Sequence, residues 1–354
     1  MGFSKRTLRA AVVGAGSMGR NHIRVLSDLS DVELVAVADL EPGNLALALR
    51  GRTAVKGFTD VVAMLEGVRP DFVVVSVPTR WHSELVETVL DRGAHCLVEK
   101  PISMTRDEAL AMTNLAAAKD VHLGVGHVER YNPAILQLRD RIVRGEAGRV
   151  LQLVARRTGP FPARVQDVGV IIDLAIHDID VMLMLTLSSV TRVYAEAARL
   201  VHEKHEDLFS GTLRFDDGQV GLLDVNWLTP FKTRELTVVC ERGTFVANYL
   251  GQELTFYENA RAAGEWESLA TLTGVAEGDV VRHHVHRVEP LRAELEAFAD
   301  AVRGEGYRYV SGDAAIAALE VTTALLRAVE TGQTVLLPQE EAAPSHGSTQ
   351  CVSG

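Results

Sequence analysis

The chain has 354 residues, 47% of them hydrophobic and 23% charged, which is an ordinary globular composition with room for about two domains. A formal net charge of −11 without any basic stripe excludes a nucleic-acid-binding surface, and no apolar run reaches the roughly 18 residues that a membrane span needs. The three cysteines, Cys96, Cys240 and Cys351, lack the spacing of metal ligands, so they are expected to be reduced thiols in a cytoplasmic protein.

Up to about residue 126, short apolar runs alternate with helical patterns. The runs are continuous rather than alternating, which is typical of strands buried on both faces of a parallel sheet: RAAVVGAG, ELVAVAD, DFVVVSVP, HCLVEKP and VHLGVGH. Thr105 and Glu108 form a capping box ahead of an alanine-rich amphipathic helix. Residues 1–126 are therefore predicted to form a doubly wound α/β domain.

The remainder of the chain has a different pattern. After a helix at about 133–144 come alternating runs, and the sequences DDG and ERG between them are typical of hairpins. We expect a mostly antiparallel sheet of about six strands, with one helix between its first two strands. Helices at about 290–303 and 312–330 close a domain that spans 127–335, and the last helix is expected to pack back onto the first domain. The polar, proline-bearing tail 336–354 is expected to be disordered.

A glycine motif of the form G-x-G-x-x-G stands at Gly14, Gly16 and Gly19, between the first strand and a helix. Asp39 ends the next strand, about 20 residues further on. In this context the glycines let the backbone approach a pyrophosphate, the helix N-terminus stabilises its charge, and Asp39 accepts from the ribose hydroxyls. A second carboxylate at Glu41 would repel a 2′-phosphate. We therefore predict NAD rather than NADP, bound here by Gly14, Gly16, Ser17, Met18, Gly19 and Asp39.

Two further segments end strands at the carboxyl edge of the predicted sheet, where ligands bind in open α/β folds. The segment SVPTRWH, taken alone, is more typical of a turn and a helix start. The segment VEKP has the composition of a solvated turn, but its location directs Lys100 into the crevice that holds the dinucleotide. The cofactor contacts predicted from these two segments are Ser76, Pro78, His82, Glu99 and Lys100.

Together these motifs resemble the Gfo/Idh/MocA family of sugar and cyclitol dehydrogenases. AVVGAGSMG, the acidic end of the second strand, VEKP and GHVERYNPA match that family in order and spacing, over nearly the whole chain to about residue 335. The family's second-domain motif, a glycine followed by D-x-x-x-H-D, stands at Gly169, Asp173, His177 and Asp178. Val168 replaces a second glycine of many members, so the preceding loop is expected to differ in shape. The resemblance implies an N-terminal Rossmann domain and a C-terminal open, mostly antiparallel sheet domain.

The stretch DVGVIIDLAIHDID places charged groups in an otherwise apolar helix, where Asp173, His177 and Asp180 share one face. Burying such groups is costly unless they are paired or used. The resemblance favours the floor of a substrate pocket. Two other interpretations stay open: a core histidine with carboxylates as caps, and a metal held by D-x-x-x-H, although no His or Cys cluster completes such a site. The segment RHHVHR at 282–287 is interpreted as a basic loop.

The resemblance implies catalytic roles for Lys100, Asp173 and His177. A histidine with an ordinary pKa of about 6.5 is suited to remove a hydroxyl proton at neutral pH. Lys100 would stabilise the developing alkoxide and Asp173 would orient the pair, although family members differ on whether lysine or histidine takes the proton. The predicted substrate contacts are Arg130, Tyr131, Asn132, Arg164, Asp173 and His177, and no metal ion is expected.

Residues 156–180 and 226–238 resemble the branch of the family that oxidises the 3-hydroxyl of UDP-N-acetylglucosamine or a related nucleotide sugar. The implied product is a 3-keto sugar, which an aminotransferase would normally take up. Basic residues flank the proposed pocket and could hold a diphosphate: Arg156, Arg157, Arg164, Lys232 and Arg234. Inositol, a hexose phosphate and a nucleoside 3′-hydroxyl are alternative substrates. A non-catalytic NAD-binding sensor is an alternative of another class.

Alternate positions of LFSGTLRF and QVGLLDVNWL are apolar on both faces, which predicts an exposed apolar patch on the antiparallel sheet. Members of the resembled family commonly pair through this sheet. The resemblance therefore implies a homodimer or a homotetramer.

Overall fold

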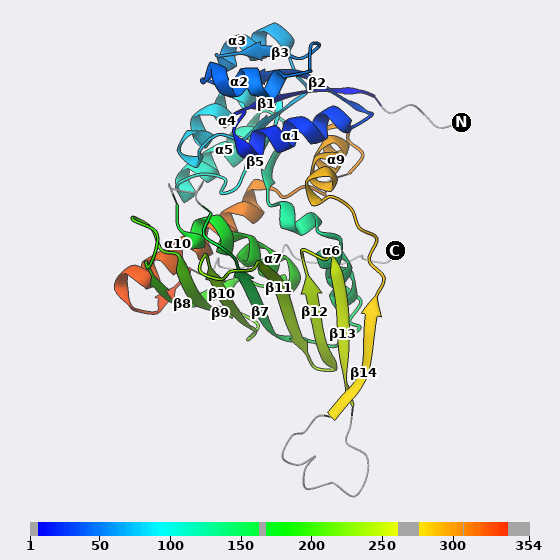
Figure 1. Ribbon diagram of the computed structural model, residues 1–354, viewed down its shortest axis with the longest axis vertical. Coiled ribbons are helices and arrows are strands. Elements are labelled where there is room, and N and C mark those ends of the chain that lie inside the picture. The colour runs from blue at the N-terminus through cyan, green and yellow to red at the C-terminus, as the bar shows by residue number, and fades with distance from the viewer. Residues whose placement is uncertain (1–5, 163–167, 261–275, 307, 339–354) are drawn as a thin grey trace, which may run out of the picture.

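A computed structural model describes residues 6–162, 168–260, 276–306 and 308–338, and Figure 1 shows a parallel-sheet domain above a broad second sheet, with helices between them. From residue 339 onward the predicted disordered tail lies outside the described residues. Within the described ranges, no helix is long and apolar enough to cross a lipid bilayer.

The first domain is built on a six-stranded parallel sheet in the order β3-β2-β1-β4-β5-β6. Its central strands β1 and β4 are almost wholly buried, because helices cover both faces. This confirms the predicted doubly wound fold. The strands are β1 (Leu8–Val13), β2 (Val32–Ala38), β3 (Lys56–Phe58), β4 (Phe72–Val75), β5 (His95–Glu99) and β6 (Leu123–Gly126).

Two groups of helices cover this sheet. One face packs on α1 (Ser17–Asp28), α2 (Pro42–Leu49) and α9 (Pro290–Val302), and the ring of Phe298 meets that of Phe72 edge-on at 5.7 Å. The other face packs on α3 (Val61–Val68), α4 (His82–Asp91), α5 (Arg106–Ala118) and the start of α10 (Gly312–Thr331). The short helix η1 (Thr79–Trp81) precedes α4. The predicted capping box of Thr105 and Glu108 is present at α5.

The second domain contains a nine-stranded sheet in the order β14-β13-β12-β11-β7-β10-β9-β8-β15, counted over the described residues. Only β7 and β10 are parallel neighbours, which confirms a mostly antiparallel sheet. The strands are β7 (Val150–Thr158), β8 (Val190–Ala198), β9 (Leu208–Phe215), β10 (Val220–Asn226), β11 (Thr233–Cys240), β12 (Gly243–Asn248), β13 (Glu253–Ala260), β14 (Ala276–His283) and β15 (Val335–Leu336).

The predicted number of about six strands is too small. The hairpins at DDG and ERG are present, since β9 pairs with β10 and β11 with β12. Two edge strands were not predicted: β14 pairs with β13, and the two-residue β15 pairs with β8. The interpretation of RHHVHR as a loop is therefore wrong at its start, because Arg282 and His283 belong to β14.

One face of this sheet packs on α6 (Pro133–Val143), α7 (Ile176–Thr186) and α10, which lie between the two sheets in Figure 1. Helix α10 serves both domains. Its first turns place Ala315 and Leu319 in the core of the first domain, whereas Leu325 and Ala328 belong to the core of the second. Two short helices precede α6 and α7: η2 (Val128–Tyr131) and the π-helical turn η3 (Ile171–Ala175).

Among the described residues, no helix packs on the opposite face of the second sheet. A row of partly exposed side chains crosses its strands in register: Tyr194, Thr212, Leu222, Val154, Thr237, Val246 and Thr255. The expectation that β9 is apolar on both faces is wrong, because its outward positions are Ser210, Thr212 and Arg214. The apolar part of this face comes instead from β7, β10 and β12.

Candidate active site

The glycine loop between β1 and α1 leaves no room for a side chain at Gly14 or Gly19, whereas Gly16 has open space around it. Gly14 has a φ of +91°, and a Cβ there would lie 2.7 Å from the carbonyl oxygen of Ser76. A Cβ on Gly19 would lie 1.8 Å from the carbonyl oxygen of Gly14. Ser17 and Met18 begin α1, whose N-terminus has no side-chain cap and no acidic residue in its first turn. A helix end of this kind is suited to a pyrophosphate, which is the fit that a dinucleotide requires.

Asp39 lies beside this loop at the end of β2. Its carboxylate accepts hydrogen bonds from the backbone N–H groups of Ala15, at 2.6 Å, and Glu41, at 2.8 Å. Ser76, after β4, donates its hydroxyl to the carbonyl oxygen of Gly14 at 2.9 Å. The predicted cofactor residues of β1, β2 and β4 are therefore brought together at one edge of the sheet.

His82 is buried and holds two loops together. Its Nδ1 lies 2.9 Å from the carbonyl oxygen of Pro101, and its Nε2 lies 3.0 Å from that of Val77. Burial lowers the pKa of His82, although these carbonyl contacts act in the opposite direction. The ring thus fixes the segment that follows Lys100 against the end of β4. The contacts of His82 in the structure are thus positional, and its contact with the cofactor stays a prediction.

Pro78 lines a cavity of about 190 Å³ between the first domain and the helix of the second. Pro101 also lines it, and Ile172 and Ile176 close it from the apolar face of η3 and α7. The cavity is therefore lined by residues adjacent in sequence to Lys100, Asp173 and His177.

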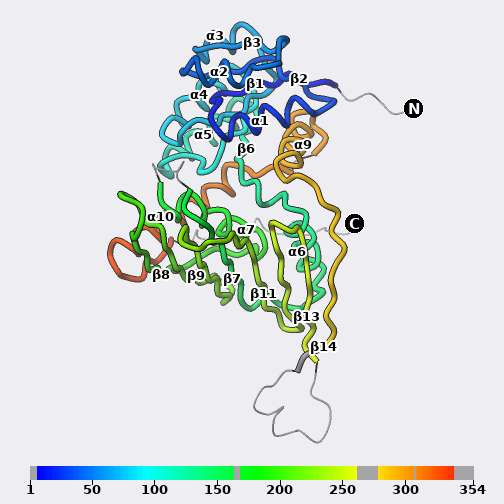
Figure 2. The backbone as a smooth tube through the Cα atoms, viewed as in Figure 1, coloured from blue at the N-terminus to red at the C-terminus, as the bar shows by residue number. Residues whose placement is uncertain are grey.

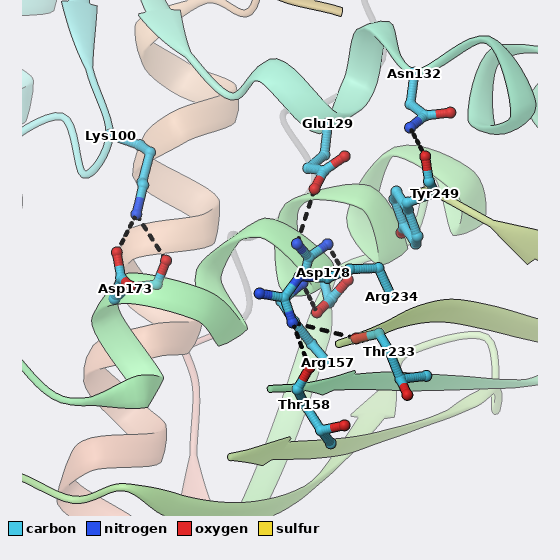
Figure 3. A network of polar contacts seen from close by, with 10 residues as sticks. All are labelled: Lys100, Glu129, Asn132, Arg157, Thr158, Asp173, Asp178, Thr233, Arg234 and Tyr249. Atoms are coloured by element: carbon cyan, nitrogen blue, oxygen red, sulfur yellow. Dashed lines mark hydrogen bonds and ion pairs between the residues drawn. The ribbon is translucent and has the colours of Figure 1, made fainter. Parts of the chain in front are cut away.

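Lys100 extends from the end of β5 toward the second domain (Figure 3). Its Nζ donates to the backbone carbonyl of Asp173 at 2.7 Å and lies 3.3 Å from the Asp173 carboxylate. The preceding residue, Glu99, lies 2.8 Å from Nε2 of the buried His22. Burial acts to raise the pKa of Glu99, but its contacts with His22 and Lys100 outweigh burial and leave the pKa lowered. Lys100 is therefore flanked by two carboxylates.

The helix that carries Asp173 begins in an unusual way. Residues Ile171–Ala175 form a π-helical turn, a feature that is frequent at functional sites. Glu206, in the chain before β9, accepts the backbone N–H of Ile171 at 3.1 Å, and a Cβ on Gly169 would lie 2.1 Å from the carboxyl carbon of Glu206. A side chain at 169 would therefore have to displace the Glu206 carboxylate, which accepts the backbone N–H of Ile171.

His177 follows Asp173 on the same side of the helix. Its Nδ1 is buried and has no hydrogen-bond partner among the described residues. Burial, and then the charges of Lys100 and Arg157, hold the pKa of His177 well below its ordinary value. The imidazole is therefore neutral at physiological pH, which is the form of a general base, and the lowered pKa makes it a weaker base than an ordinary histidine.

The other two acids of this helix have structural partners. Arg157 binds Asp178 through Nε at 2.6 Å and Nη2 at 2.9 Å, and it binds Glu129 through Nη1 at 2.8 Å. Arg130 binds Asp180 in the same bidentate manner, at 2.6 and 2.7 Å. Of the acids that were predicted to share one face, only Asp173 contacts Lys100. The interpretation of the helix as a pocket floor stays a prediction for Asp173 and His177, whereas Asp178 and Asp180 anchor the helix through their arginines.

Arg130, Tyr131 and Asn132 were predicted to contact substrate, and the structure gives each of them an internal partner. Arg130 is committed to Asp180, and the Tyr131 hydroxyl donates to the carbonyl oxygen of Arg308 at 3.2 Å. Asn132 is buried, caps α6 and donates to the carbonyl oxygen of Tyr249. The described contacts of these residues are thus internal, and their contact with substrate stays a prediction.

The basic residues that were predicted to flank the pocket separate into different groups. Arg156 is exposed and pairs with Asp224, and Arg157 is buried against Asp178. Lys232 is exposed, whereas Arg234 is partly buried at the start of β11. The predicted substrate residue Arg164 lies outside the described residues.

The role of Arg157 in the site was missed, although the sequence held a signal for it. Leu153 and Ala155 occupy the buried face of β7, so strand alternation places Arg157 on that face too. A buried arginine requires an acid, and Asp178 supplies it.

Within the described ranges, no group of three or more His, Cys, Asp or Glu residues could hold a metal ion.

Comparison with known proteins agrees with this geometry. Residues 8–127 match the oxidoreductase family with an NAD-binding Rossmann fold, and residues 135–246 match the GFO/IDH/MocA C-terminal domain. The chain belongs to the Gfo/Idh/MocA family of oxidoreductases. It is an NAD-dependent dehydrogenase of the group that acts on sugars and polyols.

Two relatives illustrate the range of substrates in this family. The UDP-N-acetylglucosamine 3-dehydrogenase of Acidithiobacillus ferrooxidans is 29% identical over 90% of this chain and 97% of its own. Its solved structure has a TM-score of 0.80 at 27% identity, covering 92% of this chain and 98% of that one. A myo-inositol dehydrogenase of Streptomyces leeuwenhoekii is 31% identical over 75% of this chain and 84% of its own. The family thus includes enzymes that act on nucleotide sugars and enzymes that act on cyclitols.

Proposed function

We propose that this enzyme oxidises the 3-hydroxyl of a nucleoside-diphosphate sugar, most simply UDP-N-acetylglucosamine, to the 3-keto sugar. The observation that carries the proposal is the meeting of Lys100, Asp173 and His177 at the carboxyl edge of the dinucleotide-binding sheet. The relative of Acidithiobacillus ferrooxidans, which aligns with nearly the whole chain, supports the choice of sugar. A 3-keto sugar is a carbonyl compound that an aminotransferase could use next.

The chemistry of the proposed reaction is divided among these residues. Bound NAD supplies the hydride acceptor. The neutral imidazole of His177 takes the proton of the substrate hydroxyl, while the ammonium of Lys100 stabilises the negative charge that develops on the oxygen. Asp173 fixes Lys100 through its carboxylate and its backbone carbonyl. In this assignment Lys100 keeps its proton, and His177 is the base.

The test is a panel of UDP-sugars, hexose phosphates, nucleosides and inositols, assayed by NADH formation in the presence of a carbonyl trap. The trap is needed because oxidation of a secondary alcohol by NAD is generally uphill and little product accumulates without it. Turnover of a UDP-N-acetylhexosamine supports the proposal. Turnover of inositol or a hexose phosphate, with none of any UDP-sugar, would overturn the choice of substrate and leave the dehydrogenase assignment in place.

We also propose that the open face of the second sheet pairs with a second copy of the chain. Leu222, Val154 and Val246 lie in one row across that face, and no helix of the described chain covers them. A dimer or tetramer is expected by light scattering at micromolar concentration. Val154→Glu should shift the species toward monomer, whereas Leu151→Glu, at an exposed position of the same strand but outside the row, is the matched control.

A further inference from the structure

Two arginines stand directly opposite each other beside the proposed reaction site. Arg157 on β7 and Arg234 on β11 are register partners in the antiparallel pairing of these strands. Like charges in that arrangement repel and destabilise a sheet unless each has a counter-charge. The two guanidinium groups lie close together in Figure 3, near the carboxylate of Asp178.

Arg157 has its full set of partners. Asp178 and Glu129 take its N–H groups, and its guanidinium also lies over the ring of Tyr249 at 5.1 Å. It is 3% exposed and therefore not available to a ligand. Its role is to hold α7, η2 and β7 together.

Arg234 has no such set. Nη1 donates to the backbone carbonyls of Thr158 at 3.1 Å and Thr233 at 3.2 Å, and no carboxylate of the described residues forms an ion pair with it. Burial, and then the charge of Arg157, lower the pKa of Arg234 to about 10, which is the response of a desolvated cation near a like charge. A partly buried arginine without a carboxylate is costly, so a function is the expected reason for keeping it.

Arg234 also lies near the reacting groups. It is among the charges that act on His177, and Asp173 is among those that act on Arg234. Of the other basic residues predicted to flank the pocket, Arg156 points into solvent beside Asp224, Lys232 is exposed, and Arg164 lies outside the described residues. Arg130, Arg156 and Arg157 each pair with a carboxylate, whereas Arg234 forms no ion pair with a described residue.

We propose that Arg234 binds an anionic group of the substrate, a carboxylate or a phosphate, close to the ring that is oxidised. This inference rests on the proposed function and makes Arg234 a specificity-determining residue for acidic substrates over neutral polyols. A planar guanidinium with free N–H groups suits either oxyanion. The anion has two possible sources: the diphosphate of the nucleotide, or a carboxylate at C6 of a hexuronic acid.

The experiment compares the wild-type enzyme with Arg234→Met and Arg234→Lys on UDP-N-acetylglucosamine, UDP-N-acetylglucosaminuronic acid and myo-inositol. Arg156→Met is the matched control, because that arginine stands next to Arg157 on the same strand and is 62% exposed. Loss of a charge-assisted hydrogen bond should raise KM roughly ten- to a hundredfold in Arg234→Met, with a smaller change in kcat. Arg234→Lys should retain part of the affinity. NAD binding by calorimetry should be unchanged in all variants.

The pattern over substrates identifies the source of the anion. A KM increase for both UDP-sugars places the diphosphate at Arg234, and an increase confined to the uronic acid places the C6 carboxylate there. If the wild-type enzyme oxidises a UDP-sugar and Arg234→Met has the same KM as Arg156→Met on every substrate, the role of Arg234 is overturned and the proposed function stands. If the wild-type enzyme oxidises only inositol, the proposed function itself fails.

Discussion

One helix carries the acids of two ion pairs, and the two pairs differ in solvent exposure. The side chains of Lys100 and Asp173 are 15% and 22% exposed, and their closest charged atoms are 3.3 Å apart. Those of Arg157 and Asp178 are 3% and 1% exposed, with a bidentate contact at 2.6 and 2.9 Å. The looser pair can exchange its partner for a substrate, whereas the buried pair cannot open without leaving a charge in the protein interior. The comparison therefore separates residues that act on a ligand from residues that hold the site in place.

The largest expected effect is on the buried pair. Arg157→Met leaves Asp178 and Glu129 without their cation, so the free energy of unfolding should fall by about 3–5 kcal/mol. Chemical denaturation measures it, and Arg156→Met is the control because its side chain is exposed. Equal stability of the two variants would show that the buried pair contributes no more than a surface pair does.

Substitutions at the Lys100–Asp173 pair and at His177 should lower turnover rather than stability. Lys100→Met and His177→Ala should each lower turnover by roughly a hundredfold or more, the scale of lost acid–base and electrostatic catalysis, and should retain NAD binding. Lys119→Met is a suitable control, since Lys119 pairs with Asp91 on the surface. Activity of His177→Ala close to that of the wild type across pH would exclude His177 as the base.

Glu294 is a buried acid whose carboxylate has no hydrogen-bond partner among the described residues. It lies on α9 with both carboxylate oxygens buried and unpartnered among the described residues, and burial together with the negative charges of Glu99 and Asp180 raises its pKa well above the ordinary value. The folded protein keeps this proton, while the unfolded chain releases it above about pH 4.3. The wild type should therefore lose stability as the pH rises above that value, toward the raised pKa of the folded state.

Glu294→Gln removes this linkage. Its stability relative to the wild type should be near equal at pH 4 and should increase by up to about 1.4 kcal/mol per pH unit above that. Thermal or urea unfolding of both proteins over pH 4–8 gives the comparison. A constant difference over that range would mean that Glu294 is ionised in the folded protein.

The smallest expected effect concerns Asp39, which supports the structure and is also predicted to bind the cofactor. Its carboxylate supports the glycine loop through Ala15 and is also the predicted reader of the ribose hydroxyls. Asp39→Ala should reduce the preference for NAD over NADP by about tenfold, or about 1.4 kcal/mol. Calorimetry with both cofactors measures it. A wild-type protein that binds NADP as tightly as NAD would contradict the assignment.

The sequence was most informative where structure depends on neighbours along the chain. Gly14 and Gly19 could be recognised because a strand, a turn and a helix follow one another, and the capping box at Thr105 depends on residues three apart. The continuous apolar runs also identified the parallel sheet, since burial on both faces removes the alternation of a half-exposed strand.

Predictions failed where the outcome depends on distant partners. Asp173, Asp178 and Asp180 are chemically alike, and only the positions of Lys100, Arg157 and Arg130 decide which of them faces the pocket. The edge strands β14 and β15 exist because β13 and β8 offer unpaired backbone groups, which the composition of the edge segments does not reveal. The π-helical turn at Ile171–Ala175 likewise depends on Glu206, which lies in a different loop.

The docking of α9 on the first sheet has a consequence for synthesis on the ribosome. All six strands of that sheet are complete at Gly126, yet the helix that covers Phe72 and Leu97 begins only at Pro290. Figure 2 shows the chain passing through strands β7 to β14 of the second sheet before it returns to the first domain at α9. At about 5–20 residues per second, the part of this face that α1 and α2 leave to α9 waits roughly 10–30 s for its cover. During that interval an apolar surface is open to chaperones, and a gene fragment that ends after β6 would expose it permanently.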